Sequence, residues 1–308
     1  MQCMRVTASG NELASSESPR PDPGPGELLI RVCAAGVTPT ELSWYPTTHT
    51  KEGRPRIGAI PGHEFSGVVV AAGAEVDTAI VGRQIYGMSD WFADGATAEF
   101  CLTQPQSIAP KPSRISHELA STVPIGALTA WQGLFDRCNL RAGERVLVHG
   151  GSGAVGLFAV QLARHHSAHV IATASGKKSE LVKQLGAEQV IDYRASRFED
   201  QVEPVDVIFD SVGGDTLDRS WQLLKPGGRI VTIASQGESA TDQRVKDAFF
   251  IVEPNGKQLE QIAQLIDHGD LRTFINVSVP LSEASKAYRN ELPGASGFGK
   301  TVIFISNS

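Results

Sequence analysis

The stretch at residues 146–164, VLVHGGSGAVGLFAVQLAR, constrains the fold of this chain more than any other. It starts with four residues that suit a buried parallel strand, passes through glycines at 150, 151, 153 and 156, and ends in apolar residues at helical spacing. Such a turn lets backbone approach a pyrophosphate, and the helix N-terminus adds free N–H groups. We interpret it as a dinucleotide-binding turn; the alternative is a tight strand-to-helix turn whose glycines serve packing only.

Composition and charge narrow the class of protein. At 308 residues the chain is long enough for two domains, and its 41% apolar and 20% charged residues are ordinary for a globular protein. A net charge of −6 without a long basic run predicts neither nucleic acid nor an anionic membrane as a partner. No signal peptide and no run of about 18 apolar residues is evident. The four cysteines form no C-x-x-C pair, which favours a reducing cytoplasm.

The pattern of predicted elements changes along the chain. The first third is rich in strands and turns without strand–helix alternation, whereas strands and helices alternate from residue 145 onward. We predict an α/β protein in which residues 118–253 form a Rossmann doubly wound parallel sheet. Residues 1–117 and 254–308 form a β-rich domain, since the tail lacks a further strand–helix rhythm. Within these, residues 118–131 are predicted helical and residues 249–252 a short strand.

The residues after the second predicted Rossmann strand indicate which nucleotide binds. An NAD-type unit places a carboxylate at the end of this strand, about 20 residues beyond the glycines, to bind the ribose hydroxyls. The strand ends at Ala174 without a carboxylate, and Ser175, Gly176, Lys177 and Lys178 follow. A hydroxyl and two ammonium groups would attract a 2′-phosphate, so the sequence favours NADP(H). Alternatively, the lysines are only a solvated helix start, although lysine is unfavourable at the positive end of a helix dipole.

A family resemblance rests on the order and spacing of several segments: PGPGELLIRVCAAGV, IPGHEFSGVVV, PIGALTAWQGL, the glycine turn, VDVIFDSVGG and GFGKTVIFI. The chain resembles the medium-chain dehydrogenase/reductase superfamily and, within it, the zinc-free quinone oxidoreductases related to zeta-crystallin. The resemblance implies a GroES-like substrate domain, a Rossmann domain and a cleft between them. It also implies a homodimer formed through the Rossmann domains, with residues 249–252 near that interface.

The resemblance further implies a set of cofactor-binding residues. They are Gly150, Gly153, Ala154, Val155 and Gly156 in the pyrophosphate turn, Ser175 and Lys178 near the 2′-phosphate, Tyr193 near the adenosine, Ser211, Val212 and Gly213 near the nicotinamide side, Thr129 at the nicotinamide, and Lys300 close to the cofactor phosphates.

Zinc-containing relatives use the histidine of a Gly-His-Glu motif, here His63, as a metal ligand. They also need a cysteine and a further ligand at positions where this chain has Thr38 and Ile125. Because catalytic zinc takes three protein ligands, we expect no metal. His63 is then either a hydrogen-bonded histidine that shapes the cleft or a direct contact of substrate or nicotinamide.

Without zinc, the expected chemistry is hydride transfer from NADPH to a quinone or an α,β-unsaturated carbonyl. A donor is wanted at the carbonyl oxygen, and the candidates are Thr40, Tyr45 and His63. Aromatic residues from 44 to 45 and from 91 to 92 either form a wall for a flat acceptor or are ordinary core and loop residues. Two other functions stay open: a zinc-type alcohol dehydrogenase with an unusual metal site, and a non-catalytic NADPH-binding protein.

Overall fold

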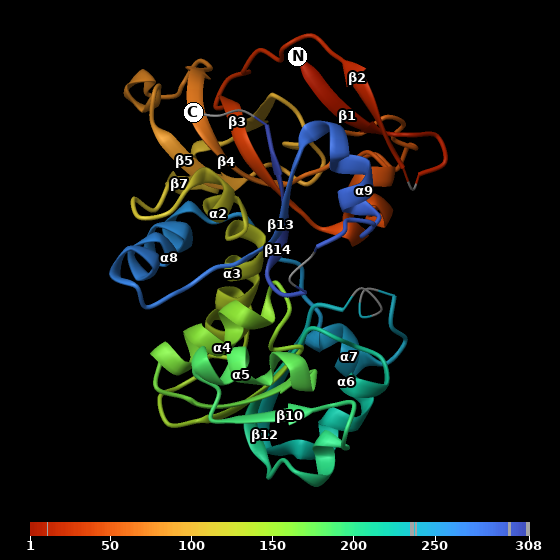
Figure 1. Cartoon of the computed structure of the whole chain (residues 1–308), viewed down its shortest axis with the longest axis vertical. Helices are drawn as coiled ribbons and strands as arrows, with labels where there is room; N and C mark the ends of the chain where they lie inside the picture. The colour runs from red at the N-terminus through yellow and green to blue at the C-terminus, as the bar shows by residue number, and fades with distance from the viewer. Residues whose placement is uncertain (11, 235–236, 238, 295–296, 306–308) are drawn as a thin grey trace. The chain divides into compact units, whose positions relative to one another are not determined.

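The computed structural model describes residues 1–10, 12–234, 237, 239–294 and 297–305. The chain forms two compact units, whose elements are labelled in Figure 1. Unit 1 comprises Met1–Ile125, Pro254–Gly269 and Thr273–Ser308, and unit 2 comprises Gly126–Glu253 with Asp270–Arg272. The first boundary therefore falls after residue 125, whereas the sequence placed it after residue 117.

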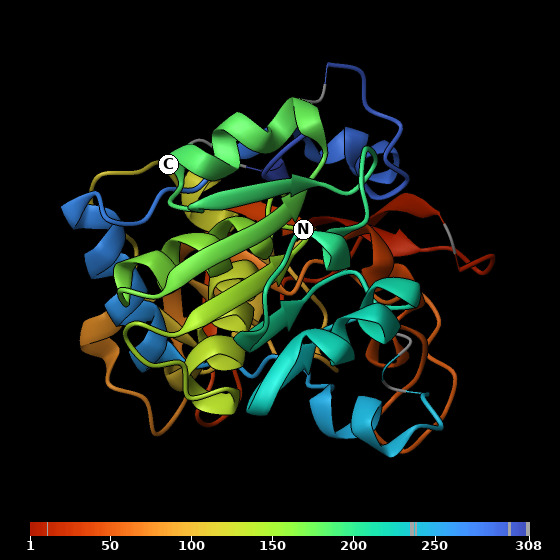
Figure 2. The ribbon, with the colours of Figure 1, turned by 90° about the horizontal axis from the view of Figure 1, so that it is seen from below.

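Unit 2 is built on a five-stranded sheet. Its strands are β8 (Arg145–His149), β9 (His169–Ala174), β10 (Gln189–Asp192), β11 (Val205–Asp210) and β12 (Leu224–Thr232). Their order is β10-β9-β8-β11-β12, and every neighbouring pair is parallel. Figure 2 shows these strands side by side. The predicted α/β class with a Rossmann-type parallel sheet is confirmed.

Helices follow the strands of unit 2. They are α4 (Gly156–His165), α5 (Ser179–Gln184), α6 (Asp215–Ser220) and α7 (Gln243–Ala248), with short 3₁₀ turns η5 (Gly176–Lys178), η6 (Phe198–Asp200) and η7 (Trp221–Leu223). A π-helical turn, η4 (Gln132–Arg137), continues α3 (Pro124–Trp131). Strand β8 is apolar along its centre because helices cover both faces of a parallel sheet; Val146, Leu147 and Val148 are fully buried.

Two predicted elements differ from the structure. The helix expected over residues 118–131 is divided into α2 (His117–Ser121) and α3, because Pro124 begins α3 and disfavours helical backbone in the residue before it. The strand predicted at residues 249–252 was wrong: within the described residues, only Phe249 pairs there, through one parallel bridge with Thr232. The apolar residues of this segment suggested a strand, but the segment does not continue the hydrogen-bonded pairing of the unit 2 sheet beyond this bridge.

Unit 1 is built on an antiparallel-rich sheet. Its strands are β3 (Leu28–Val37), β4 (Glu64–Ala72), β5 (Gln84–Met88), β6 (Phe100–Thr103), β7 (Ile108–Pro110), β13 (Ile275–Pro280) and β14 (Lys300–Phe304). The main order is β13-β14-β3-β4-β5-β7, and β6 also pairs with β3. Because β14 pairs with β3, the end of the chain completes the sheet begun near its start.

Shorter elements surround this sheet. A hairpin is formed by β1 (Gln2–Val6) and β2 (Leu13–Glu17). The segment that connects β3 to β4 contains η1 (Pro39–Ser43) and α1 (Tyr45–Thr48). Three more 3₁₀ turns are η2 (Thr78–Ile80), η3 (Pro105–Ser107) and η9 (Leu281–Glu283). Helix α2 packs on β3 and β4, which explains why the boundary of unit 1 lies after residue 117. Helices α8 (Gly256–His268) and α9 (Ala284–Tyr288) follow.

All four cysteines are buried and none forms a disulfide. Cys3, Cys33 and Cys101 lie in unit 1, and Cys138 lies in unit 2. Burial raises the pKa of the Cys101 thiol, and it raises that of Cys138 to about 12 against the opposing charge of Arg229. These thiols therefore stay protonated at neutral pH.

Candidate functional site

The glycine turn between β8 and α4 is shaped by close contacts of its own backbone. Gly150 has a φ of +74°, a conformation that favours glycine. A Cβ on Gly156 would lie 2.1 Å from the Gly150 carbonyl oxygen, whereas one on Gly153 would lie 3.3 Å from the same atom. Gly156 is thus required for α4 to start against the turn, whereas a side chain at Gly153 would need a shift of only a few tenths of an ångström.

This turn leaves backbone donors available. The Gly153 N–H donates to the Gly150 carbonyl at 2.9 Å. In the described part of the chain, the N–H groups of Ala154 and Val155 donate to no protein acceptor, and both residues are partly exposed just ahead of α4. Free N–H groups at a helix N-terminus suit a phosphate, so these residues fit the pyrophosphate of a dinucleotide.

A cavity of about 670 Å³ lies in unit 2 beside the glycine turn. Its volume is in the range of small-molecule sites. Five residues assigned to the cofactor by resemblance line it: Gly150, Gly153, Tyr193, Ser211 and Val212. Of the remaining assigned residues in unit 2, Ser175 and Lys178 follow the cavity-lining residue Ala174, and Gly213 follows Val212. Thr129 is buried on α3.

A buried carboxylate holds the loop after β11. Asp210 accepts hydrogen bonds from the Gly213 N–H at 3.0 Å and from the Thr232 hydroxyl at 2.7 Å. Burial raises the pKa of Asp210, and these hydrogen bonds oppose the rise. The Ser211 hydroxyl donates to the carbonyl of His149 at 2.8 Å, which fixes the loop against the end of β8.

His149 is a cavity residue that the sequence analysis missed. Its Nδ1 lies 3.2 Å from the Thr173 hydroxyl and its Nε2 lies 2.9 Å from the Ser220 hydroxyl. The Ser220 hydroxyl itself donates to the Thr216 carbonyl, so Nε2 carries the hydrogen. Burial, reinforced by the charge of Arg219, lowers the pKa of His149 to about 3, so the imidazole is neutral at physiological pH. It was missed because a histidine inside an apolar strand was interpreted only as part of that strand.

The turn after β9 carries exposed positive charge. Ser175 precedes η5, and its carbonyl accepts from the Lys178 N–H at 2.8 Å. Among the described residues, no carboxylate lies within ion-pair distance of Lys177 or Lys178. One carboxylate does approach the turn from the next strand: Asp192 pairs with Ala174 in the β10–β9 register. The search of the sequence missed it because that search was confined to β9.

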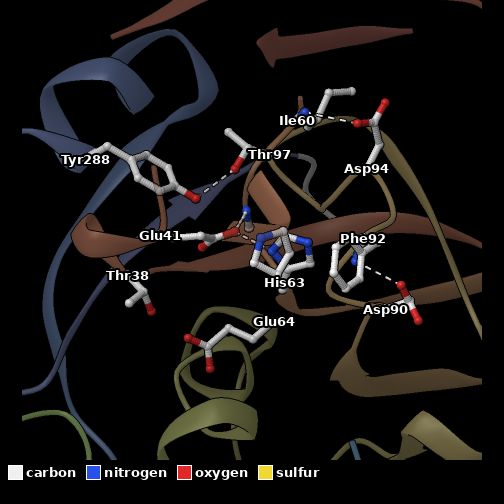
Figure 3. Close-up of polar contacts among 12 residues, drawn as sticks. Thr38, Glu41, Ile60, His63, Glu64, Asp90, Phe92, Asp94, Thr97 and Tyr288 are labelled. Atoms are coloured by element: carbon white, nitrogen blue, oxygen red, sulfur yellow. Dashed lines mark hydrogen bonds and ion pairs between the residues drawn. The ribbon is translucent and has the colours of Figure 1, made fainter. Parts of the chain in front are cut away.

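In unit 1, a carboxylate and an imidazole form a buried pair. Glu41 Oε1 lies 2.5 Å from His63 Nδ1 and also accepts the Gly62 N–H at 2.6 Å. Both side chains are about 1% exposed, and Figure 3 shows the carboxylate directed at the ring. Because the carboxylate accepts, Nδ1 carries a hydrogen, which leaves Nε2 for another partner. Within the described residues, His63 Nε2 and Glu41 Oε2 are buried without one.

The resemblance places Lys300 close to the cofactor phosphates, and that contact stays a prediction; in the structure the side chain lies in unit 1 beside a carboxylate. Its ammonium forms an ion pair with Glu64 and lies 3.4 Å from the Thr38 hydroxyl, and its side chain is 6% exposed. Glu64 also accepts the Ile125 N–H at 3.0 Å. Burial raises the pKa of Glu64 and the charge of Lys300 opposes this. A buried carboxylate needs a counter-charge, and that requirement places Lys300 inside unit 1.

These donors do not fit a zinc ion. Glu41 holds His63 Nδ1, Lys300 occupies Glu64, and Figure 3 shows the Glu64 carboxylate and Thr38 apart from the imidazole. Across the part of the chain that the structure describes, no three His, Cys, Asp or Glu residues gather as a metal site. We therefore derive no catalytic step through a metal.

The other candidate donors, Thr40 and Tyr45, are more exposed to solvent than His63, and the aromatic residues pack on one another. Thr40 is exposed, and in the described residues no contact links it with His63. Tyr45 is about half exposed, and its ring stacks on His49 with centroids 4.7 Å apart. The predicted aromatic residues do gather: ring centroids are 5.4 Å apart for Trp44 and Trp91, 5.3 Å for Trp91 and His63, and 6.5 Å for Tyr45 and Phe92.

Comparison with known proteins identifies the family. A model described as the alcohol dehydrogenase GroES-like domain matches residues 24–128, and one described as zinc-binding dehydrogenase matches residues 185–303. A human mitochondrial protein named as an NAD(P)H oxidoreductase is 32% identical, over 91% of this chain and 82% of its own length. The chain belongs to the medium-chain dehydrogenase/reductase superfamily. It is an NAD(P)H oxidoreductase of this superfamily, as the sequence predicted.

Solved structures agree with this assignment. A quinone oxidoreductase from Coxiella burnetii superimposes with a TM-score of 0.88 at 29% identity and covers 99% of both chains. A mycobacterial protein solved with NADPH gives a TM-score of 0.81 at 28% identity, again over 99% of both chains. The β-rich unit is thus GroES-like, as the resemblance implied. In the described residues, no helix has the length and apolar character needed to cross a membrane.

Proposed function

We propose that this protein is a zinc-independent, NADPH-dependent reductase of quinones or α,β-unsaturated carbonyls. The observation that carries the proposal is the glycine turn of unit 2, whose free N–H groups lie beside a cavity. The turn after the neighbouring strand β9 adds two lysines that have no carboxylate partner among the described residues. We propose that unit 2, which holds most of the predicted residues 118–253, supplies the NADP(H) domain, and that unit 1, which holds the predicted residues 1–117 and most of 254–308, supplies the substrate domain. A bound NADPH would supply the hydride.

The residues of unit 2 would bind and orient the cofactor. Ala154 and Val155 donate backbone N–H groups to the pyrophosphate, and Gly156 lets α4 approach it. Ser175 and Lys178 attract the 2′-phosphate, and Tyr193 lies at the adenosine. Ser211, Val212 and Gly213, held by Asp210, shape the loop toward the nicotinamide side, and Thr129 approaches the nicotinamide.

His63 is the group in unit 1 best suited to handle a proton. Glu41 accepts the Nδ1–H, so Nε2 is the nitrogen left for the acceptor. It donates to the acceptor oxygen when the ring is doubly protonated, with the Glu41 carboxylate stabilising that imidazolium as negative charge develops on the oxygen. The nearby indole of Trp91 limits access of water to the ring. Tyr45 and Thr40 remain secondary candidates for a contact with the acceptor carbonyl.

Activity and binding measurements test the proposal directly. NADPH oxidation, followed at 340 nm with a panel of quinones and alkenals, should show turnover, and chelators should leave the rate unchanged. No turnover across the panel, despite tight NADPH binding, would instead support a non-catalytic nucleotide-binding protein. Stoichiometric zinc together with loss of activity on chelation would support the alcohol dehydrogenase.

Variants of the buried pair test the role of His63. His63→Asn should lower kcat by about 10²-fold or more, and Glu41→Gln should lower it by a smaller factor while changing the solvent isotope effect. Tyr288→Phe removes a buried hydroxyl that bonds to Thr97 in the same unit and serves as the control for packing damage. If His63→Asn and Tyr288→Phe have equal kcat, His63 has only a structural role.

We propose a homodimer and a cytoplasmic location as well. The dimer is supported by the family, and the exposed Ile251 offers an apolar contact on unit 2. Light scattering on the purified protein would give its mass, and a monomer at micromolar concentration would exclude the dimer. The four cysteines are buried and form no disulfide, which supports a reducing compartment. Cell fractionation decides between the cytoplasm and the mitochondrion named for the human relative.

A further inference from the structure

Asp192 places a carboxylate against the turn that would take the 2′-phosphate. A Cβ built on Gly176 would lie 2.5 Å from Asp192 Oδ2, so the carboxylate touches this turn from the side of β10. Its other oxygen, Oδ1, accepts the Arg194 N–H at 3.0 Å, and its carbonyl accepts the N–H groups of Ala195 and Ser196. These bonds fix the carboxylate beside Gly176.

The position follows from the sheet itself. Strands β9 and β10 are parallel neighbours, and their last residues, Ala174 and Asp192, are register partners. The carboxyl ends of parallel strands meet at one edge, which is where a Rossmann unit binds the ribose. An acid at the end of β10 therefore reaches the region that NAD-type units reach with an acid at the end of the preceding strand.

Three cationic residues lie near Asp192 in the chain or on the adjacent turn, but among the described residues none forms an ion pair with its carboxylate. Lys177 and Lys178 belong to the same turn, and Arg194 follows two residues after Asp192 and lines the cavity. Among the described residues, none of these three cations is within ion-pair distance of Asp192 or of another carboxylate. By contrast, the cavity arginines Arg197 and Arg219 are both paired with Glu199.

We propose that Asp192 is a specificity-determining residue that limits the preference for NADPH over NADH. Its negative charge repels a 2′-phosphate held by the Ser175 turn, and its oxygens can accept a hydrogen bond from the free ribose hydroxyl of NADH. The lysines and Asp192 act in opposite directions, so the site accepts both cofactors with NADPH favoured. This inference rests on the proposed nucleotide binding in unit 2.

The test compares the dissociation constants of NADPH and NADH for the full-length protein by titration calorimetry or fluorescence. Asp192→Asn removes the charge and retains an oxygen that can accept the Arg194 N–H. It should raise the ratio of the NADH constant to the NADPH constant by about tenfold, the size expected for one unscreened charge at a few ångströms in a partly solvated site. High salt should reduce that gain, since exposed charges are screened.

Asp200→Asn is the matched control. It removes the same charge from an exposed side chain of η6, eight residues further along the chain, which pairs with Arg197 and not with the Gly176 turn, and the ratio should stay within twofold. Thermal melting of both variants checks that they are folded. An unchanged ratio in Asp192→Asn, with both cofactors still binding, overturns the role of Asp192 and leaves the proposed function intact. Failure of the wild-type protein to bind either cofactor overturns both.

Discussion

Lysines are placed in opposite ways in the two units. In unit 1 the ammonium of Lys300 is buried, paired with Glu64 and close to the Thr38 hydroxyl. In unit 2, Lys177 is exposed and Lys178 half-buried, and both lie on a turn without an ion-pair partner in the described residues. A buried and paired cation supports the fold, whereas an exposed and unpaired one is available to a ligand. Substitutions should therefore change stability in unit 1 and affinity in unit 2.

The largest effect should come from Lys300→Met. It leaves Glu64 buried without a counter-charge, so the free energy of unfolding should fall by about 3–5 kcal/mol in denaturant titrations. The double variant Glu64→Gln/Lys300→Met should recover much of this loss. NADPH affinity of the folded fraction should stay within twofold. A tenfold loss of affinity with little loss of stability would restore the phosphate contact implied by the resemblance and contradict the comparison.

Next in size is Gly156→Ala. Its Cβ would lie 2.1 Å from the Gly150 carbonyl oxygen, so the turn must shift and stability should fall by about 2–3 kcal/mol, with a matching loss of NADPH binding. Gly153→Ala is the control, because its nearest contact is 3.3 Å. Both variants are measured by thermal melting and NADPH titration. Equal losses of stability and NADPH affinity in the two variants would contradict the view that the close contact of Gly156 with the Gly150 carbonyl sets it apart from Gly153.

Stability should also depend on pH through His149 in unit 2. Its folded-state pKa of about 3 lies below the ordinary value of 6.5, so the unfolded chain binds the proton first. This contribution is complete above pH 6.5 and is lost as the pH falls toward 3; from pH 7 to pH 5 it amounts to about 2 kcal/mol. His149→Gln should flatten that part of the unfolding profile. If the free energy of unfolding of the variant depends on pH as it does in the wild-type protein, His149 is not the group responsible for that dependence.

The smallest effect should be that of Lys178→Gln on cofactor binding. Loss of one cation near the 2′-phosphate should weaken NADPH binding by about tenfold and leave NADH binding and stability nearly unchanged. Lys183→Gln, on the exposed side of α5, is the charge-matched control. If both variants weaken NADPH equally, only the net charge of the unit matters and not the position of Lys178.

The sequence was informative wherever the backbone alone determines the structure. The glycines of the β8–α4 turn and the alternation of strands and helices predicted the Rossmann sheet because both depend on local spacing. Helix α8 ends in the same local way, at Gly269 in the left-handed conformation that glycine favours. Pro124 is a local signal as well, because it disfavours helical backbone in the residue before it and so divides the predicted helix over residues 118–131.

Contacts between distant segments could not be predicted in this way. Glu41 meets His63 from a different element, Lys300 meets Glu64 across more than two hundred residues, and Asp192 meets Gly176 through a neighbouring strand. Each pairing requires knowing which strands are adjacent. The placement of Asp192 could have been found by asking which strand lies beside β9, since parallel strands share an edge at their carboxyl ends.

The burial of the four cysteines has a chemical consequence if the acceptors are the quinones or enones proposed above. Quinones and enones alkylate sulfur through the thiolate, and none of the four sulfurs is offered to solvent. The raised pKa values of Cys101 and Cys138 further reduce the reactive form. Under the proposed function, this burial would protect the four thiols from alkylation by the acceptors.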